Sequence, residues 1–107
     1  MGPKSPRRLM LEESLAEDPG DRFLRYGLAM QCLREGDVSE GRERLKDLIS
    51  DHPADQIAAH QQLGQSYVET EELDLAREIL SAGIRLARKA GDQHAAAEMD
   101  GLLQIIG

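Results

Sequence analysis

The sequence repeats one pattern of apolar and charged residues with a stride of 34–35 positions. Moving the stretch "EGDVSEGRERLKDLISDHP" forward by 35 positions places Leu45 over Leu80 and Ile49 over Ile84. Moving it back by 34 positions places Leu45 over Leu11. A fixed internal period of this length indicates a repeat protein, in which one unit cannot bury its apolar face alone and must pack on the next.

Within each period the apolar residues recur at helical spacing, for example Leu24, Leu28 and Cys32. Aromatic residues make up only 3% of the chain, and β-sheets draw on aromatic and β-branched residues. The sequence therefore predicts an all-α fold of about six helices and no strand. The expected helices begin at Pro6 and after Asp21, Asp37, Asp55, Glu72 and Asp92.

Large and small residues alternate along the expected buried faces. Leucines are expected to fill the seams between helices, and small residues should let two helices approach closely. The interior glycines Gly41 and Gly83 should weaken their helices by about 0.5–1 kcal/mol each relative to alanine. The expected seam positions are Leu28, Leu45, Leu63 and Leu80, and the expected close approaches are Ala29, Gly41, Gly64 and Ala76.

Two degenerate motifs follow the same order in each period. The first helix reads His60-x-x-Leu63-Gly64-x-x-Tyr67, and the second reads Ala76-x-x-x-Leu80. Residues 7–107 thereby resemble the tetratricopeptide repeat family, although Arg25 and His60 replace the family's aromatic residue. The resemblance implies antiparallel helix-turn-helix repeats stacked as a short right-handed α-solenoid. The expected organisation is a flexible tail at residues 1–5 and one repeat domain at 6–107. Within the domain we expect a lone helix at 6–18, a first repeat at 21–53, a second repeat at 55–91 and a capping helix at 92–106.

In this family the first helices of successive repeats line a concave groove that holds peptides. Methionine adapts to varied apolar partners, and glutamine offers donors and acceptors to a peptide backbone. Alternatively, Phe23, Tyr26 and Met30 pack against the lone N-terminal helix at residues 6–18. The matching positions lack the Lys/Asn carboxylate clamp of chaperone-binding members. The resemblance places in the groove Phe23, Tyr26, Met30, Leu33, Arg34, Ala58, Gln61, Gln62, Gln65 and Glu69.

Charge and composition limit the partners. The net charge is −7, which disfavours nucleic acid and anionic membranes, because both are bound mainly through Lys and Arg. The basic cluster Lys4, Arg7 and Arg8 is too short to outweigh this charge. No run approaches the roughly 20 apolar residues of a membrane helix, and no signal-peptide core follows the basic start. A cytoplasmic protein is expected.

Chemistry-bearing residues are sparse. His94 and Glu98 lie four residues apart, a spacing that suits half a metal site with His60 as a further ligand, but solvent-exposed polar side chains are the simpler interpretation. Cys32 cannot form an internal disulfide and lies on an apolar stripe. We therefore expect that the protein is not an enzyme and holds no cofactor or metal. We expect an interaction module that binds a protein or peptide. The alternative is a homodimer through an apolar C-terminal helix that carries Leu102, Leu103, Ile105 and Ile106.

Overall fold

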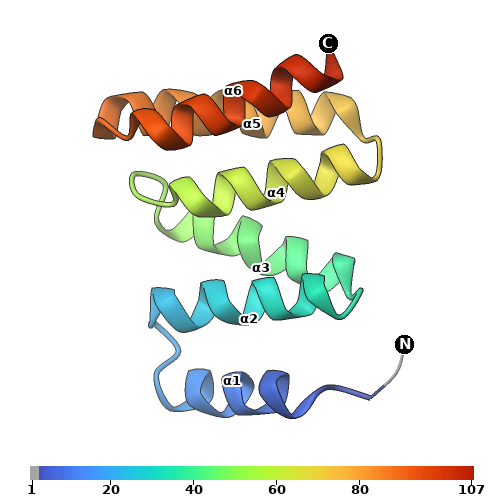
Figure 1. The fold of residues 1–107 in the computed structure, drawn as a ribbon. Helices are drawn as coiled ribbons and strands as arrows, with labels where there is room; N and C mark the ends of the chain where they lie inside the picture. Colours follow the sequence, from blue (N-terminus) through green and yellow to red (C-terminus); the bar gives the residue numbers. More distant parts are fainter. Residues whose placement is uncertain (1–2) are drawn as a thin grey trace. The chain divides into compact units, whose positions relative to one another are not determined.

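The computed structural model describes residues 3–107, and every regular element among them is a helix (Figure 1). This confirms the predicted all-α class with six helices for the described part of the chain. Residues 1–2 of the expected tail lie outside it. The helices are α1 (Pro6–Glu17), α2 (Arg22–Arg34), α3 (Val38–Asp51), α4 (Ile57–Glu69), α5 (Leu73–Ala90) and α6 (Gln93–Ile106).

The chain divides between Ser50 and Asp51 into two units, which we describe separately. The N-terminal unit holds α1, α2 and nearly all of α3. The C-terminal unit holds α4, α5 and α6.

Side-chain caps start four of the helices where the sequence predicts them, and the cap of α3 is Asp37, whose Oδ1 accepts from the backbone N–H of Glu40 at 3.4 Å. The backbone N–H of Arg8 donates to Ser5 Oγ at 3.1 Å, and the N–H groups of the third residues of α2 and α6 donate to Asp21 and Asp92. Helix α4 begins at Ile57, one residue later than expected. Its N-cap is Gln56 rather than Asp55, and the Gln56 side chain makes no capping hydrogen bond. Local hydrogen bonds thus determine where the chain enters α1, α2, α3 and α6.

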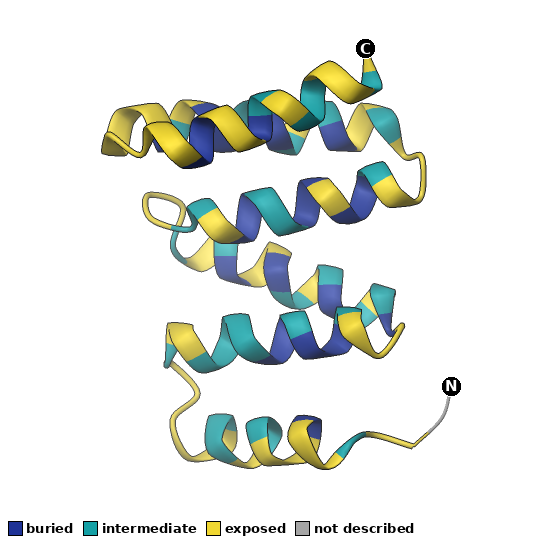
Figure 2. Ribbon diagram, in the orientation of Figure 1, coloured by how far each residue is buried: buried dark blue, intermediate teal, exposed yellow. Residues whose placement is uncertain are grey.

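The core of the N-terminal unit lies between α2 and α3. Leu28, Cys32 and Leu45 are fully buried, as the apolar spacing predicts. Figure 2 shows buried stretches in dark blue on both helices. A Cβ on Gly41 would lie 2.6 Å from Leu33 Cδ2, so only glycine allows this contact between the helices. Leu33, predicted to line a groove, therefore lies in the seam between α2 and α3.

Helix α1 packs on α2 with a single buried residue, and that residue is charged. Arg8 is 4% exposed, and its Nη2 lies 3.0 Å from both Asp37 Oδ2 and Glu40 Oε1. Its Nη1 lies 3.8 Å from Glu35 Oε1. The sequence analysis grouped Arg8 with Lys4 and Arg7 as a basic cluster at the N-terminus and did not predict this buried contact.

Glycine also allows close packing in the C-terminal unit. A Cβ on Gly64 of α4 would lie 2.6 Å from Leu80 Cγ of α5. A Cβ on Gly83 of α5 would lie 2.6 Å from Met99 Sδ of α6 and 2.8 Å from His60 Cβ of α4. The expectation that Gly83 only weakens its helix was therefore incomplete, because the missing Cβ makes room for both neighbouring helices.

Candidate functional site

A hollow of about 320 Å³ lies on the C-terminal unit, between side chains of α4 and α6. Helix α4 contributes two glutamines, and α6 contributes one carboxylate, one glycine and two aliphatic side chains. These six residues are Gln61, Gln65, Glu98, Gly101, Leu102 and Ile105.

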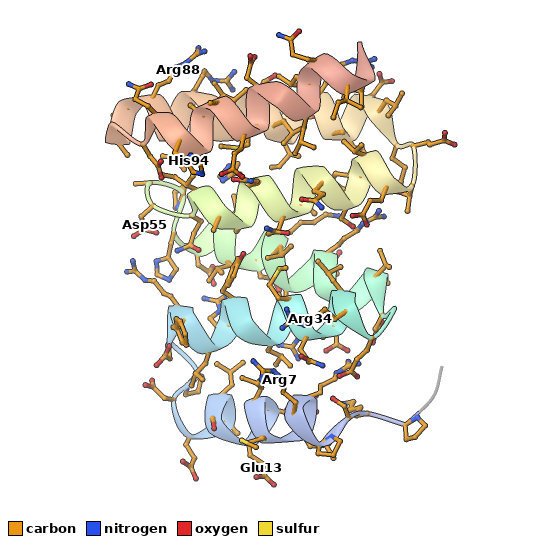
Figure 3. The ribbon with its side chains drawn as sticks, in the orientation of Figure 1. Arg7, Glu13, Arg34, Asp55, Arg88 and His94 are labelled. Atoms are coloured by element: carbon orange, nitrogen blue, oxygen red, sulfur yellow. The ribbon has the colours of Figure 1, made fainter. Side chains whose placement is uncertain are left out.

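One side of the hollow is polar and held by contacts across the two helices. Gln61 Nε2 donates to Glu98 Oε2 at 2.8 Å, and the other carboxylate oxygen of Glu98 contacts His94 Nε2. Figure 3 shows His94 near the start of α6. Gln65 Nε2 donates to Glu69 Oε1 at 3.3 Å along α4. The amide oxygens of Gln61 and Gln65 remain acceptors that a peptide N–H could reach.

The other side of the hollow is apolar and exposed. Ile105 is 75% exposed, which is unusual for a large aliphatic side chain, and Leu102 is half-buried. Apart from its chain neighbours and the nearby backbone of its own helix, no described atom lies within 4 Å of the place where a Cβ of Gly101 would be. The hollow therefore has room for an apolar side chain beside bare helix backbone.

The predicted groove residues fall into two sets on different units. Gln61, Gln62, Gln65 and Glu69 lie on α4, and the structure brings Gln61 and Gln65 together with α6. Gln62 is half-buried, and Glu69 and Ala58 are exposed. The other set lies on α2 of the N-terminal unit: Phe23, Tyr26, Met30, Leu33 and Arg34.

The side chains of this second set differ in environment. Phe23 is 84% exposed, whereas Tyr26 and Met30 are half-buried, and burial raises the pKa of Tyr26. The guanidinium of Arg34 donates to Gln31 Oε1 at 3.3 Å within the same helix. Only Phe23 therefore presents a large apolar surface from this set.

The sequence interpretation separated the residues of α6 from the groove. It assigned Glu98 to a possible metal pair and Leu102 and Ile105 to self-association. The excess of apolar residues near the C-terminus was the available signal. What it lacked was the packing of α6 on α4.

Neither His60 nor Cys32 lines the hollow. His60 is buried, and its Nδ1 lies 2.7 Å from the carbonyl oxygen of Gln56. Within residues 3–107 no three His, Cys, Asp or Glu side chains are placed to hold a metal. Burial raises the pKa of the Cys32 thiol, which makes the nucleophilic thiolate scarcer.

A second hollow, of about 430 Å³, is larger but offers less for recognition. It is lined by Pro53, Ala54, Leu86, Lys89 and Ala90. Lys89 is its one charged side chain, and none of the predicted site residues reaches it. We therefore take the α4–α6 hollow as the candidate site.

Comparison with known proteins adds no identification: no family model, no curated protein and no solved structure matches the chain. None of the helices in residues 3–107 is long and apolar enough to cross a membrane.

Proposed function

We propose that this chain is a non-catalytic protein-interaction module that binds a peptide segment in the α4–α6 hollow. A long apolar side chain of the peptide enters beside Leu102 and Ile105, and its backbone N–H groups donate to the glutamine amides. We further propose that the helical pairs are tetratricopeptide-type repeats stacked as a right-handed solenoid. The 34–35-residue period and the two motifs in the sequence support this part of the proposal.

The observation that carries the proposal is Gly101. An interior glycine costs a helix about 1 kcal/mol relative to alanine. At Gly64 and Gly83 close packing requires the glycine, but at Gly101 no described neighbour does. The missing side chain keeps the hollow open. Ligand binding therefore explains the glycine at this position, whereas packing against neighbouring helices does not.

Selection of random peptides on the intact protein, followed by affinity measurement, tests the proposal. Gly101→Leu fills the hollow and should weaken the selected peptides by about tenfold or more, which corresponds to about 1.4 kcal/mol. Glu78→Leu places the same side chain at an exposed position of α5 outside the hollow and should leave affinity unchanged.

Phe23→Ala separates the two predicted sets of residues. If the hollow is sufficient, this variant binds as tightly as the wild type. Peptides that lose affinity with Phe23→Ala but not with Gly101→Leu would move the site to α2 and refute the proposal.

A self-associating protein is the second candidate function, and the exposure of Ile105 favours it. In this case α6 of a second copy covers Ile105. Sedimentation velocity should then show a dimer that Ile105→Gln dissociates. A wild-type monomer at high concentration would eliminate this candidate and leave the peptide proposal intact.

A further inference from the structure

We propose that Glu35, Asp37 and Glu40 form an arginine socket that recognises an arginine on an amphipathic helix of a partner protein, and that Arg8 is its resident, displaceable occupant. The socket lies at the turn between α2 and α3 and in the first turn of α3. It belongs entirely to the N-terminal unit and is independent of the function proposed for the α4–α6 hollow.

The three carboxylates suit a guanidinium in number and placement. Asp37 and Glu40 each accept Arg8 Nη2 at 3.0 Å, and Glu35 lies 3.8 Å from Nη1. The planar guanidinium has five N–H donors in a fixed fork, whereas a lysine ammonium is a compact point charge. The socket should therefore distinguish arginine from lysine.

Each carboxylate of the socket has a contact that does not involve α1, although Glu35 also accepts hydrogen bonds from Ser5, the N-cap of α1. Glu40 Oε2 accepts from Arg44 Nε at 2.9 Å, and Glu35 Oε2 accepts from Gln31 Nε2 at 2.7 Å. The backbone N–H of Glu40 donates to Asp37 Oδ1 at 3.4 Å. These hydrogen bonds can persist when Arg8 leaves, so the carboxylates remain arranged for another guanidinium.

The resident occupant is held incompletely. Arg8 Nε is buried and has no hydrogen-bond partner among the described residues, and an unsatisfied buried donor is destabilising. Arg8 is also the only buried residue of α1, whereas Leu9 and Met10 are 49% and 65% exposed. Helix α1 therefore contributes little apolar burial to oppose its release.

The contacts of α1 define the partner that could replace it. Leu11, three residues after Arg8, lies 3.7 Å from the place of a Cβ on Gly27 in α2. Residues three apart lie on the same face of a helix. The replacing helix should present Arg-x-x-Leu on one face, and it would bind better than α1 if it also satisfied the guanidinium Nε. The net charge of −7 favours approach of such a cationic helix.

A labelled synthetic peptide of residues 3–18 is a direct probe of the socket on the full chain. It should bind the wild type weakly, because the tethered α1 competes at an effective concentration of about millimolar. Arg8→Ala in the chain empties the socket and should tighten binding of the peptide by about tenfold or more. Leu11→Ala loosens α1 and keeps the socket intact, so it should tighten binding too and serves if Arg8→Ala does not fold.

Two matched changes test recognition of the guanidinium. A peptide with Arg8→Lys should bind the Arg8→Ala chain about tenfold more weakly than the arginine peptide. Asp37→Asn, added to the Leu11→Ala chain, keeps the side-chain shape and should remove the gain. Equal binding of the lysine and arginine peptides, or binding indifferent to Asp37→Asn, would overturn the proposal. Dimers of the Leu11→Ala chain that exchange α1 would reassign the partner to a second copy and also overturn it.

Discussion

At the residue scale, a glycine inside a helix can stabilise or destabilise the fold, depending on what occupies the place of its missing Cβ. A Cβ on Gly64 would lie 2.6 Å from Leu80 Cγ, and Leu80 is fully buried. The leucine has little room to move, because protein interiors are close-packed. Gly101 has open space instead. The same substitution should therefore have opposite effects at these two positions.

Gly64→Ala should lower the free energy of unfolding by about 1–3 kcal/mol, the usual range for overpacking a tight contact. Gly101→Ala should raise it by about 0.5–1 kcal/mol, since alanine favours the helix and meets no neighbour. Urea unfolding followed by circular dichroism measures both changes. A Gly64→Ala protein more stable than the wild type would contradict the close packing of α4 on α5.

At the scale of the element, the one buried residue of α1 is an arginine, and carboxylates from the turn after α2 and from α3 surround it. Hydrogen bonds from Ser5 and Gln31 lower the pKa of Glu35. A hydrogen bond from Arg44 and the charges of Arg44 and Arg8 lower the pKa of Glu40, although its partial burial opposes them. Both carboxyl groups have an ordinary pKa of 4.5, so folding favours their ionised forms.

Acidification should therefore release α1. A carboxyl group whose pKa is lowered by folding contributes its full stabilisation above its ordinary pKa of 4.5 and loses it as the pH falls through the lowered value. NMR chemical shifts of the α1 amides should move toward unfolded values below pH 4.5, before those of α5. Glu35→Gln should reduce this dependence. Loss of α1 at neutral pH, or its full retention after both groups are protonated, would be inconsistent with this explanation.

At the scale of the whole molecule, the sequence predicted what local signals determine. The period and the helix starts at Ser5, Asp21 and Asp92 gave the number and limits of the helices, because caps act within three residues. The buried Leu28 and Leu45 followed from helical spacing in the same way.

Contacts between residues far apart in the sequence were not predicted. Asp37 pairs with Arg8 over 29 positions, and Gln61 bonds Glu98 over 37 positions. An arginine in a basic cluster near the N-terminus has the pattern of a surface residue, so nothing local indicated the burial of Arg8. The candidate hollow required the packing of α6 on α4, which spacing within either helix does not specify.

The net charge of the chain also predicts that it does not bind nucleic acids. Thirteen Lys and Arg residues stand against twenty Asp and Glu residues, and one arginine, Arg8, is already committed to a buried acidic cluster. Nucleic acids gain affinity by exchanging counterions for protein cations, and here acidic residues outnumber the cations. Labelled single-stranded and duplex oligonucleotides should show no saturable anisotropy change at physiological salt. Oligonucleotide binding that weakens steeply as salt rises would reveal a cationic surface and would refute this prediction. As a control, a labelled cationic peptide with as many residues as the oligonucleotide has nucleotides should show a larger anisotropy change with the protein than the oligonucleotides do.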